Sequence, residues 1–218
     1  MTDFAHARRT MVDCQIRPND VTEGRVIDAF LAVPREDFLP ADRKALAYAD
    51  IDIPLGKTSA PRHLIPPMIL AKMAQAATIL HTDAILDVGA GTGYSSAVLS
   101  HLGAKVVALE CDDDIAADAK TALAPYGNVS VATGPLERGA AASGPYDVII
   151  LEGSVEEIPP DLFHSLREGG RLLAVVGRGR SGRATIFVRV GEDFSGRVAF
   201  DAALPPLPGF ERKPVFTF

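Results

Sequence analysis

Three glycines at alternate positions, Gly89, Gly91 and Gly93, directly follow a short apolar run over residues 84–88. An apolar run of this length that ends in a glycine turn is typical of a buried strand, and the residues after the turn have the pattern of a helix. Glycine allows a tight turn and a close approach of the backbone to a ligand, and the following helix offers free amide hydrogens. The segment therefore predicts a strand, a turn and a helix with a ligand site at the strand end.

Strand-like and helix-like segments alternate from residue 84 to residue 176. This alternation predicts a doubly wound, Rossmann-like α/β fold with a mostly parallel sheet and helices on both faces. Two further segments joined by a glycine-bearing turn, 183–190 and 197–201, predict an antiparallel C-terminal hairpin. The other predicted strands are 84–88, 105–109, 128–132, 146–151 and 171–176, and the predicted helices are one that ends at 102, one over 113–123 and one over 159–166.

Residues 1–80 have a different character, with helices joined by proline-rich turns, and predict an N-terminal helical extension. One buried helical face is indicated by the spacing of Val26, Ile27, Phe30, Leu31 and Val33. The prolines predict an extended or looping segment over 52–67 and a helix over 67–79. With 218 residues and 47% hydrophobic content, we expect a single domain over 1–218.

The formal net charge of −6 argues against a general electrostatic grip on nucleic acid, which needs a broad basic face. The short basic run over 178–183 contains glycines and predicts an exposed turn. No apolar run approaches the roughly 20 residues that cross a bilayer, and the first ten residues lack a signal-peptide core. Cys14 and Cys111 lie far apart without metal-ligand spacing, which predicts reduced thiols and no metal site. We therefore expect a cytoplasmic protein with no nucleic-acid or membrane partner.

A carboxylate ends the second predicted strand at Glu110, 23 residues after Asp87. An ionised carboxylate offers two acceptor oxygens and can bind both ribose hydroxyls of an adenosine, which favours Glu110 as a ribose ligand over a solvated strand-end acid. A dinucleotide fingerprint would need a glycine at the position of Tyr94, whose bulk would obstruct a pyrophosphate. The pattern thus disfavours a dinucleotide.

The segment 87–94, D-V-G-A-G-T-G-Y, resembles motif I of class I methyltransferases, which bind S-adenosylmethionine through such a strand, turn, helix and acidic residue. Further stretches follow the order found in protein-L-isoaspartate O-methyltransferases: V-P-R-E-D-F-L-P (33–40), A-Y-A-D (47–50), I-P-L-G-K-T-S-A-P (53–61), G-P-Y-D-V-I (144–149), I-P (158–159) and L-R-E-G-G-R-L (166–172). The resemblance implies that residues 81–218 form a cofactor-binding core for S-adenosylmethionine. The cofactor contacts that it implies are Asp87, Gly89, Ala90, Gly91, Gly93, Tyr94, Glu110 and Leu136.

The resemblance also implies a repair reaction, in which the α-carboxylate of an isoaspartyl residue in a damaged protein receives the methyl group. A carboxylate is already ionised at pH 7, so catalysis can rest on orientation and desolvation. The family holds its substrate with a serine in a Gly-x-Thr-x-Ser loop, for which Thr58 and Ser59 are the nearest counterparts here. These two residues are adjacent, whereas the family has one residue between them.

Two alternatives to the repair reaction stay open. A methyltransferase with a different acceptor is indicated by the altered loop at Thr58 and Ser59 and by Glu152, where the family has small residues after the fourth strand. A non-catalytic binding protein with reduced cofactor affinity is indicated by G-P-L (134–136), where the family has Gly-Asp-Gly near the adenine.

Four other residues near the predicted site have two interpretations each. Glu152 would repel an anionic substrate or bind a cation, or else be a solvent-facing acid. Arg62 would attract an anionic substrate, although a solvated charge is the commoner role of an arginine. We expect His63 to be structural and Cys111 to be a small buried thiol.

Overall fold

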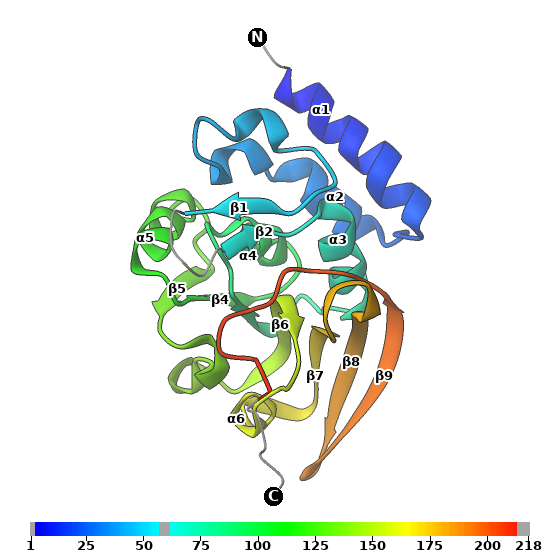
Figure 1. Cartoon of the computed structure of the whole chain (residues 1–218), viewed down its shortest axis with the longest axis vertical. Coiled ribbons are helices and arrows are strands. Elements are labelled where there is room, and N and C mark those ends of the chain that lie inside the picture. Colours follow the sequence, from blue (N-terminus) through cyan, green and yellow to red (C-terminus); the bar gives the residue numbers. More distant parts are fainter. Residues whose placement is uncertain (1–2, 57–61, 213–218) are drawn as a thin grey trace, which may run out of the picture.

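The computed structural model describes residues 3–56 and 62–212 (Figure 1). Its central strands are β3 (Ala84–Val88), β4 (Lys105–Glu110), β5 (Val129–Thr133), β6 (Tyr146–Val155), β7 (Leu166–Val176), β8 (Arg183–Val190) and β9 (Asp193–Asp201). They form one seven-stranded sheet in the order β5-β4-β3-β6-β7-β8-β9. The first five of these run parallel, and β8 and β9 are added antiparallel. The predicted Rossmann-like sheet with an antiparallel C-terminal hairpin is therefore confirmed.

Two hydrophobic cores cover the two faces of the sheet. On β3, Ile85 belongs to one core and Leu86 to the other, because successive side chains of a strand point to opposite faces. The first core contains residues from α1 (Phe4–Met11), α2 (Gly24–Ala32), α3 (Pro67–Ala76), α4 (Tyr94–Ser100) and α5 (Asp113–Ala122). The second core lies under α6 (Pro160–His164), the 3-10 turn η5 (Leu136–Arg138) and the C-terminal residues Leu207 and Phe210.

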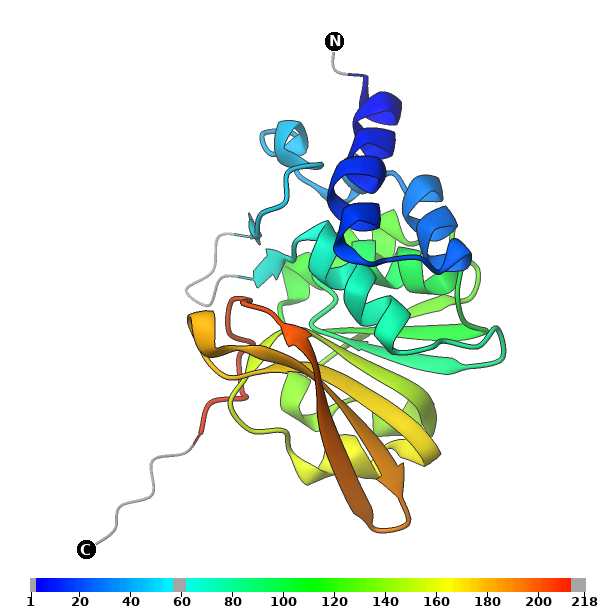
Figure 2. The same cartoon turned by 90° about the vertical axis from the view of Figure 1, so that its right-hand side faces the viewer.

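The N-terminal helices stack above α3 on the first face of the sheet (Figure 2). Asp3 caps α1 by accepting a hydrogen bond from the amide of His6 at 3.0 Å. Short turns follow in this extension: η1 (Val12–Ile16), η2 (Arg17–Asn19), η3 (Arg35–Phe38) and η4 (Lys44–Leu46). Four of the five residues predicted to form a buried helical face are buried, and Leu31 is partly buried against the same core.

The described part of the proline-rich segment over 52–67, which was predicted to be extended or looping, contains extended backbone. Two short strands, β1 (Ile53–Leu55) and β2 (Arg62–Leu64), pair antiparallel, with Ile53 opposite Leu64. The ladder extends over only three residue pairs, and the central one is Pro54, which has no amide hydrogen to donate. Alternation is nevertheless visible in burial, since Ile53 and Leu55 are buried and Pro54 is exposed.

Element boundaries differ from the predicted ones in several other places. The helix predicted over 67–79 ends at Ala76, two residues before Thr78, whose φ of 50° lies in the left-handed region. Strand β6 continues past the predicted end at 151 through an irregular register between Ile150 and Ser154. Helix α6 spans only five residues, and β7 and β9 begin earlier than predicted. Two further 3-10 turns are η6 (Ala141–Ser143) and η7 (Gly179–Ser181). Turn η7 lies within the basic run over 178–183.

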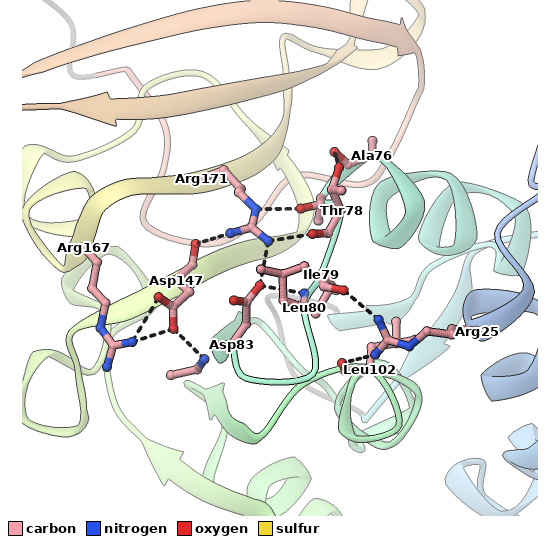
Figure 3. A network of polar contacts seen from close by, with 12 residues as sticks. Arg25, Ala76, Thr78, Ile79, Leu80, Asp83, Leu102, Asp147, Arg167 and Arg171 are labelled. Atoms are coloured by element: carbon pink, nitrogen blue, oxygen red, sulfur yellow. Dashed lines mark hydrogen bonds and ion pairs between the residues drawn. The ribbon is translucent and has the colours of Figure 1, made fainter.

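A network of arginines closes the amino-terminal ends of the parallel strands (Figure 3). Arg171 of β7 donates to the carbonyl oxygens of Ala77 at 2.6 Å and Thr78 at 2.8 Å, which follow α3. Arg25 of α2 donates to the carbonyl of Ile79 at 2.9 Å. These bonds tie the N-terminal extension and the turn before β3 to the sheet, on the opposite edge from the glycine turn.

Candidate cofactor site at the strand ends

The glycine turn connects β3 to α4. Gly89, Gly91 and Gly93 have φ angles of 79°, 57° and 98°, in the left-handed region that glycine tolerates. The amides of Gly89 and Ala90 donate to the carbonyl of Leu109 at 2.8 and 3.1 Å, and the amide of Gly93 donates to the carbonyl of Ala90 at 2.9 Å. These amides of the turn are therefore used within the protein.

Asp87 is a buried carboxyl on β3. Its Oδ2 atom accepts hydrogen bonds from the hydroxyls of Ser95 and Ser96 in α4, each at 2.6 Å. Its Oδ1 atom has no hydrogen-bond partner among the described residues. Burial raises the pKa of Asp87 to about 6, and Glu110 adds to this rise, while the two serines and Arg62 oppose it. Asp87 is thus anchored on one oxygen and open to a proton or a donor on the other.

Glu110 is fully buried at the end of β4. Its Oε2 atom accepts from the amide of Gly91 at 2.8 Å, and its Oε1 atom accepts from the amides of Cys111 at 2.8 Å and Asp112 at 3.3 Å. The carboxylate is therefore fixed against the glycine turn, as a ribose ligand requires. The alternative of a solvated strand-end acid is wrong.

Arg62, in β2 of the N-terminal extension, contacts the Glu110 carboxylate. Its Nε atom lies 3.1 Å from Oε1 and 3.2 Å from Oε2 of Glu110, and its Nη2 atom donates to the carbonyl of Gly89 at 2.6 Å. Only 2% of Arg62 is exposed. The prediction of a solvated charge is wrong, because a partner that is 48 residues away in the sequence removes the arginine from solvent.

Glu152 lies in β6, directly after Leu151, which pairs with Val88. It is buried, with 5% of its surface exposed, so the solvent-facing interpretation is wrong. Its Oε1 atom has no hydrogen-bond partner among the described residues. Burial, followed by the Asp87 carboxyl, raises the pKa of Glu152 well above its ordinary value, while Arg62 and Arg35 oppose the rise. Three buried carboxyls and one arginine therefore meet at the ends of adjacent strands.

Tyr94 and Arg35 join the glycine turn to the N-terminal extension. The Tyr94 ring is fully buried and packs edge to face with Phe30 and Phe38, at centroid distances of 6.2 and 5.7 Å. The guanidinium carbon of Arg35 lies 4.6 Å from the centre of the Tyr94 ring, and its Nη2 atom donates to the carbonyl of Ile65 at 2.8 Å. The Tyr94 side chain thus packs inside the first core, and Arg35 is a buried residue that sequence reasoning missed as part of this region.

The C-terminal segment also reaches the glycine turn. The amide of Leu207 donates to the carbonyl of Ser154 at 2.9 Å, and the amide of Ser154 donates to the carbonyl of Pro205 at 2.8 Å. A Cβ atom placed on Gly89 would lie 2.8 Å from a methyl carbon of Leu207, and one on Gly153 would lie 2.7 Å from its Cγ. Leu207 therefore fills space beside the turn, and no sequence signal connected this residue with the site.

The remaining predicted site residues fall into two groups. Leu136 is buried in η5 within the second core, and Gly134 before it donates to the carbonyl of Glu110 at 3.0 Å. Thr58 and Ser59 lie outside the described residues. Cys111 is exposed as a residue, which corrects the expectation of a buried thiol. Partial desolvation of its thiol, followed by the nearby Glu110 carboxylate, raises the pKa of Cys111 to about 11. His63 lies in β2 opposite Pro54.

A cavity of about 480 Å³ opens on the other side of the turn, between η3, the end of β1 and α5. The residues that line it include Phe38, Leu55, Gly56, Thr92 and Ile115. Thr92 is held there by its hydroxyl, which donates to the carbonyl of Phe38 at 2.6 Å. Over residues 3–56 and 62–212, no group of three or more His, Cys, Asp or Glu residues is arranged to hold a metal ion.

The donor set fits an adenosine-containing cofactor in its chemistry. Glu110 offers a fixed buried carboxylate of the kind that accepts hydrogen bonds from ribose hydroxyls. Gly89 has no side chain, so the backbone there forms the floor of the site. In this conformation, however, the space over that floor is taken by the guanidinium of Arg62 and the side chain of Leu207. The site therefore fits the cofactor only if at least one of these two side chains moves.

Comparison with known proteins shows the family. Residues 7–202 match the family described as protein-L-isoaspartate (D-aspartate) O-methyltransferase. A protein-L-isoaspartate O-methyltransferase of Koribacter versatilis is 41% identical over 181 residues, which cover 81% of this chain and 79% of that protein.

Two solved structures share the fold. A protein-L-isoaspartate O-methyltransferase matches with a TM-score of 0.82 and 26% identity, covering 93% of this chain and 66% of the other. A protein from Plasmodium falciparum, described as a complex with S-adenosyl-L-homocysteine, matches with a TM-score of 0.75 and 14% identity, covering 94% of this chain and 98% of the other. On the family match and the curated relative, the chain belongs to the protein-L-isoaspartate (D-aspartate) O-methyltransferase family.

Proposed function

We propose that the chain transfers a methyl group from S-adenosylmethionine to the α-carboxylate of isoaspartyl residues in damaged proteins or peptides. Members of this family are S-adenosylmethionine-dependent methyltransferases. The observation that carries the proposal is the family match over residues 7–202, which includes the N-terminal extension as well as the sheet. The glycine turn at the switch from β3 to α4 and the fixed carboxylate of Glu110 support it.

The residues that would hold the cofactor surround this turn. Glu110 would accept the ribose hydroxyls, and Asp87 would accept a donor on its free oxygen. The backbone of Gly89, Ala90, Gly91, Gly93 and Tyr94 would form the floor beneath the cofactor, and Leu136 would flank the adenine. When bound, S-adenosylmethionine supplies the methyl group.

The acceptor side is assigned to the loop that contains Thr58 and Ser59. Their hydroxyls would donate hydrogen bonds to the isoaspartyl carboxylate and hold it near the methyl donor. The reaction needs no general base, because the acceptor is ionised at neutral pH. Glu152 does not contradict an anionic acceptor, because its raised pKa favours the neutral form and so weakens repulsion.

We extend the proposal to the whole chain and its location. Residues 1–218 would act as one methyltransferase domain in the cytoplasm, with 1–80 as the substrate-side appendage and 81–218 as the cofactor-binding core. The first hydrophobic core supports a single domain, since it contains residues of the extension and of the sheet together. Within the described parts of the chain, no helix is long and apolar enough to span a membrane.

A methyl-transfer assay tests the proposed function. The purified chain is incubated with radiolabelled S-adenosylmethionine and an isoaspartyl peptide, and the matched aspartyl peptide is the control. We expect label in the isoaspartyl peptide alone, as a base-labile methyl ester. Absence of transfer by a chain that binds the cofactor would contradict the proposed acceptor.

A second candidate function is methyl transfer to a different acceptor, which the buried Glu152 favours. A carboxyl at this position could pair with a cationic group of the acceptor if it became ionised. Assays with small amine and carboxylate acceptors separate the two functions. Label in an amine acceptor with none in the isoaspartyl peptide would favour the second candidate.

A further inference from the structure

Every acceptor position on the Glu110 carboxylate is engaged within the protein. Oε2 accepts from Gly91 at 2.8 Å and from Arg62 at 3.2 Å. Oε1 accepts from Arg62 at 3.1 Å and from the amides of Cys111 and Asp112. An ionised carboxylate has about four lone-pair sites, so two further hydroxyl donors have no place on it. The backbone amides are fixed by the fold. Two side-chain donors remain that a rotation can remove: the Cys111 thiol, whose sulfur lies 3.3 Å from Oε1, and the Arg62 guanidinium, which contacts both oxygens and carries the charge.

The Arg62 guanidinium also covers the floor of the site. Its Nη2 atom is 2.6 Å from the carbonyl oxygen of Gly89, and a Cβ atom on Gly89 would lie 2.4 Å from this nitrogen. The contact is enclosed, since Arg62 is 2% exposed and Glu110 is fully buried. Charges attract more strongly in such surroundings than in water. Arg62 is therefore a firmly held occupant of the space between the carboxylate and the glycine turn.

We propose that Arg62 competes with the cofactor for Glu110 and so sets the affinity of the chain for S-adenosylmethionine. The proposal rests on the proposed function for its ligand. A ribose would engage Glu110 only in molecules where Arg62 has left the carboxylate. The apparent dissociation constant is the intrinsic one divided by the fraction of molecules that can bind. If Arg62 contacts Glu110 in about nine of ten molecules, binding is therefore about 10-fold weaker.

Calorimetry with S-adenosylhomocysteine measures this competition without turnover. Arg62→Gln removes the charge and retains a shorter amide donor, and Arg62→Ala removes the group entirely. We expect the dissociation constant to fall about 10-fold or more in both variants. Arg167→Ala is the matched control, because Arg167 pairs with Asp147 near the opposite edge of the sheet, and its binding should equal that of the wild type.

A measurement on the unmodified chain covers the case in which the variants do not fold, since loss of Arg62 leaves Glu110 buried without a counter-charge. The Nε–H resonance of Arg62 is followed by NMR during titration with S-adenosylhomocysteine. We expect this signal to shift as the Glu110 bond is broken. Bound ligand with an unchanged Arg62 signal would overturn the proposal, as would folded variants with wild-type affinity.

The outcomes separate this inference from the proposed function. Methyl transfer to the isoaspartyl peptide with no effect of Arg62 on binding would overturn the competition alone. Tighter binding by the Arg62 variants with no transfer to that peptide would support the competition and contradict the proposed acceptor. Absence of binding by the wild type and by both folded variants would overturn both.

Discussion

Arg171 Nη2 lies 2.6 Å from Asp83 Oδ2, and this ion pair joins β7 to the turn before β3 (Figure 3). The same guanidinium donates to two backbone carbonyls after α3. It therefore satisfies a largely buried carboxylate and two carbonyls of a turn that ends at Thr78, a residue with positive φ. This side chain therefore links β7 to the end of α3 and to the turn before β3.

We expect Arg171→Ala to lower the free energy of unfolding by about 3 kcal/mol, because it leaves Asp83 buried without its partner. Urea denaturation followed by circular dichroism measures the change. Arg167→Ala is the control, since Arg167 is half exposed in its pair with Asp147 and should cost under about 1 kcal/mol. Equal losses in the two variants would show that burial does not distinguish these pairs.

The second prediction concerns Asp87, whose pKa is about 6 against an ordinary value of 3.8. The folded chain keeps a proton here at pH values where the unfolded chain has released it. Stability from this group is therefore complete below about pH 4 and is lost as the pH rises through about 6. The shift corresponds to about 3 kcal/mol, at 1.36 kcal/mol per pH unit.

Asp87→Asn tests this coupling by removing the titrating group while it keeps the shape of the side chain. We expect the unfolding free energy of the wild type, measured relative to the variant, to fall between pH 4 and pH 7. Asp118→Asn, on the exposed face of α5, is the control and should follow the wild-type pH profile. A constant difference between wild type and Asp87→Asn across this range would contradict the prediction.

Local pattern was sufficient to predict the sheet. Strand β3 over Ala84–Val88 and strand β8 over Arg183–Val190 have the predicted bounds, because apolar runs and glycine turns delimit them within the chain itself. The segment that contains β1 and β2 was predicted only as extended or looping, and the pairing of the two strands was not predicted, because a strand of three residues with a proline at its centre has too little periodicity to detect. The end of α3 was misplaced because the turn at Thr78 is stabilised by Arg171, far away in the sequence.

The site was predicted less completely than the fold. Glu110 was expected to serve the site at the glycine turn, and the structure places its carboxylate against that turn, where it accepts from the amide of Gly91. A solvent-facing charge was one of the two interpretations of Arg62 and of Glu152, because an isolated charge in a sequence is usually exposed. Their burial depends on contacts between β2, β3, β4 and β6 that no local pattern encodes. Leu207 enters the site for the same reason, through backbone pairing with Ser154.

A third prediction links Glu152 to the pH dependence of the proposed reaction. The pKa of this carboxyl is raised, so it is neutral at low pH and becomes ionised as the pH rises through its folded-state value. The added negative charge then repels an acceptor carboxylate. We expect KM for an isoaspartyl peptide to rise with increasing pH in the wild type, as Glu152 ionises, and to stay level in Glu152→Gln.

Steady-state methyl transfer with both proteins provides the measurement. Glu168→Gln is the control, because Glu168 is an exposed acid at the start of β7 that bonds the amide of Gly191. Its KM profile should match that of the wild type. A level profile in the wild type would show that Glu152 stays neutral or does not face the acceptor.

The last prediction separates two reasons for the glycine at position 93. Its φ is 98°, and a Cβ atom there would lie 2.6 Å from Cδ1 and 2.8 Å from Cγ of Leu123, at the end of α5. Gly93→Ala therefore combines backbone strain with a clash and should cost about 3 kcal/mol of unfolding free energy. Gly169→Ala has a φ of 71° with open space around the new methyl group, so strain alone should cost about 1 kcal/mol.

Gly127→Ala completes the set, because it has open space and no positive φ, and its effect should be close to zero. Urea denaturation of the three variants gives the comparison, and the order Gly93, Gly169, Gly127 is the expected result. If Gly93→Ala costs no more than Gly169→Ala, Leu123 moves aside at little cost. The left-handed backbone alone would then account for the glycine at the start of α4.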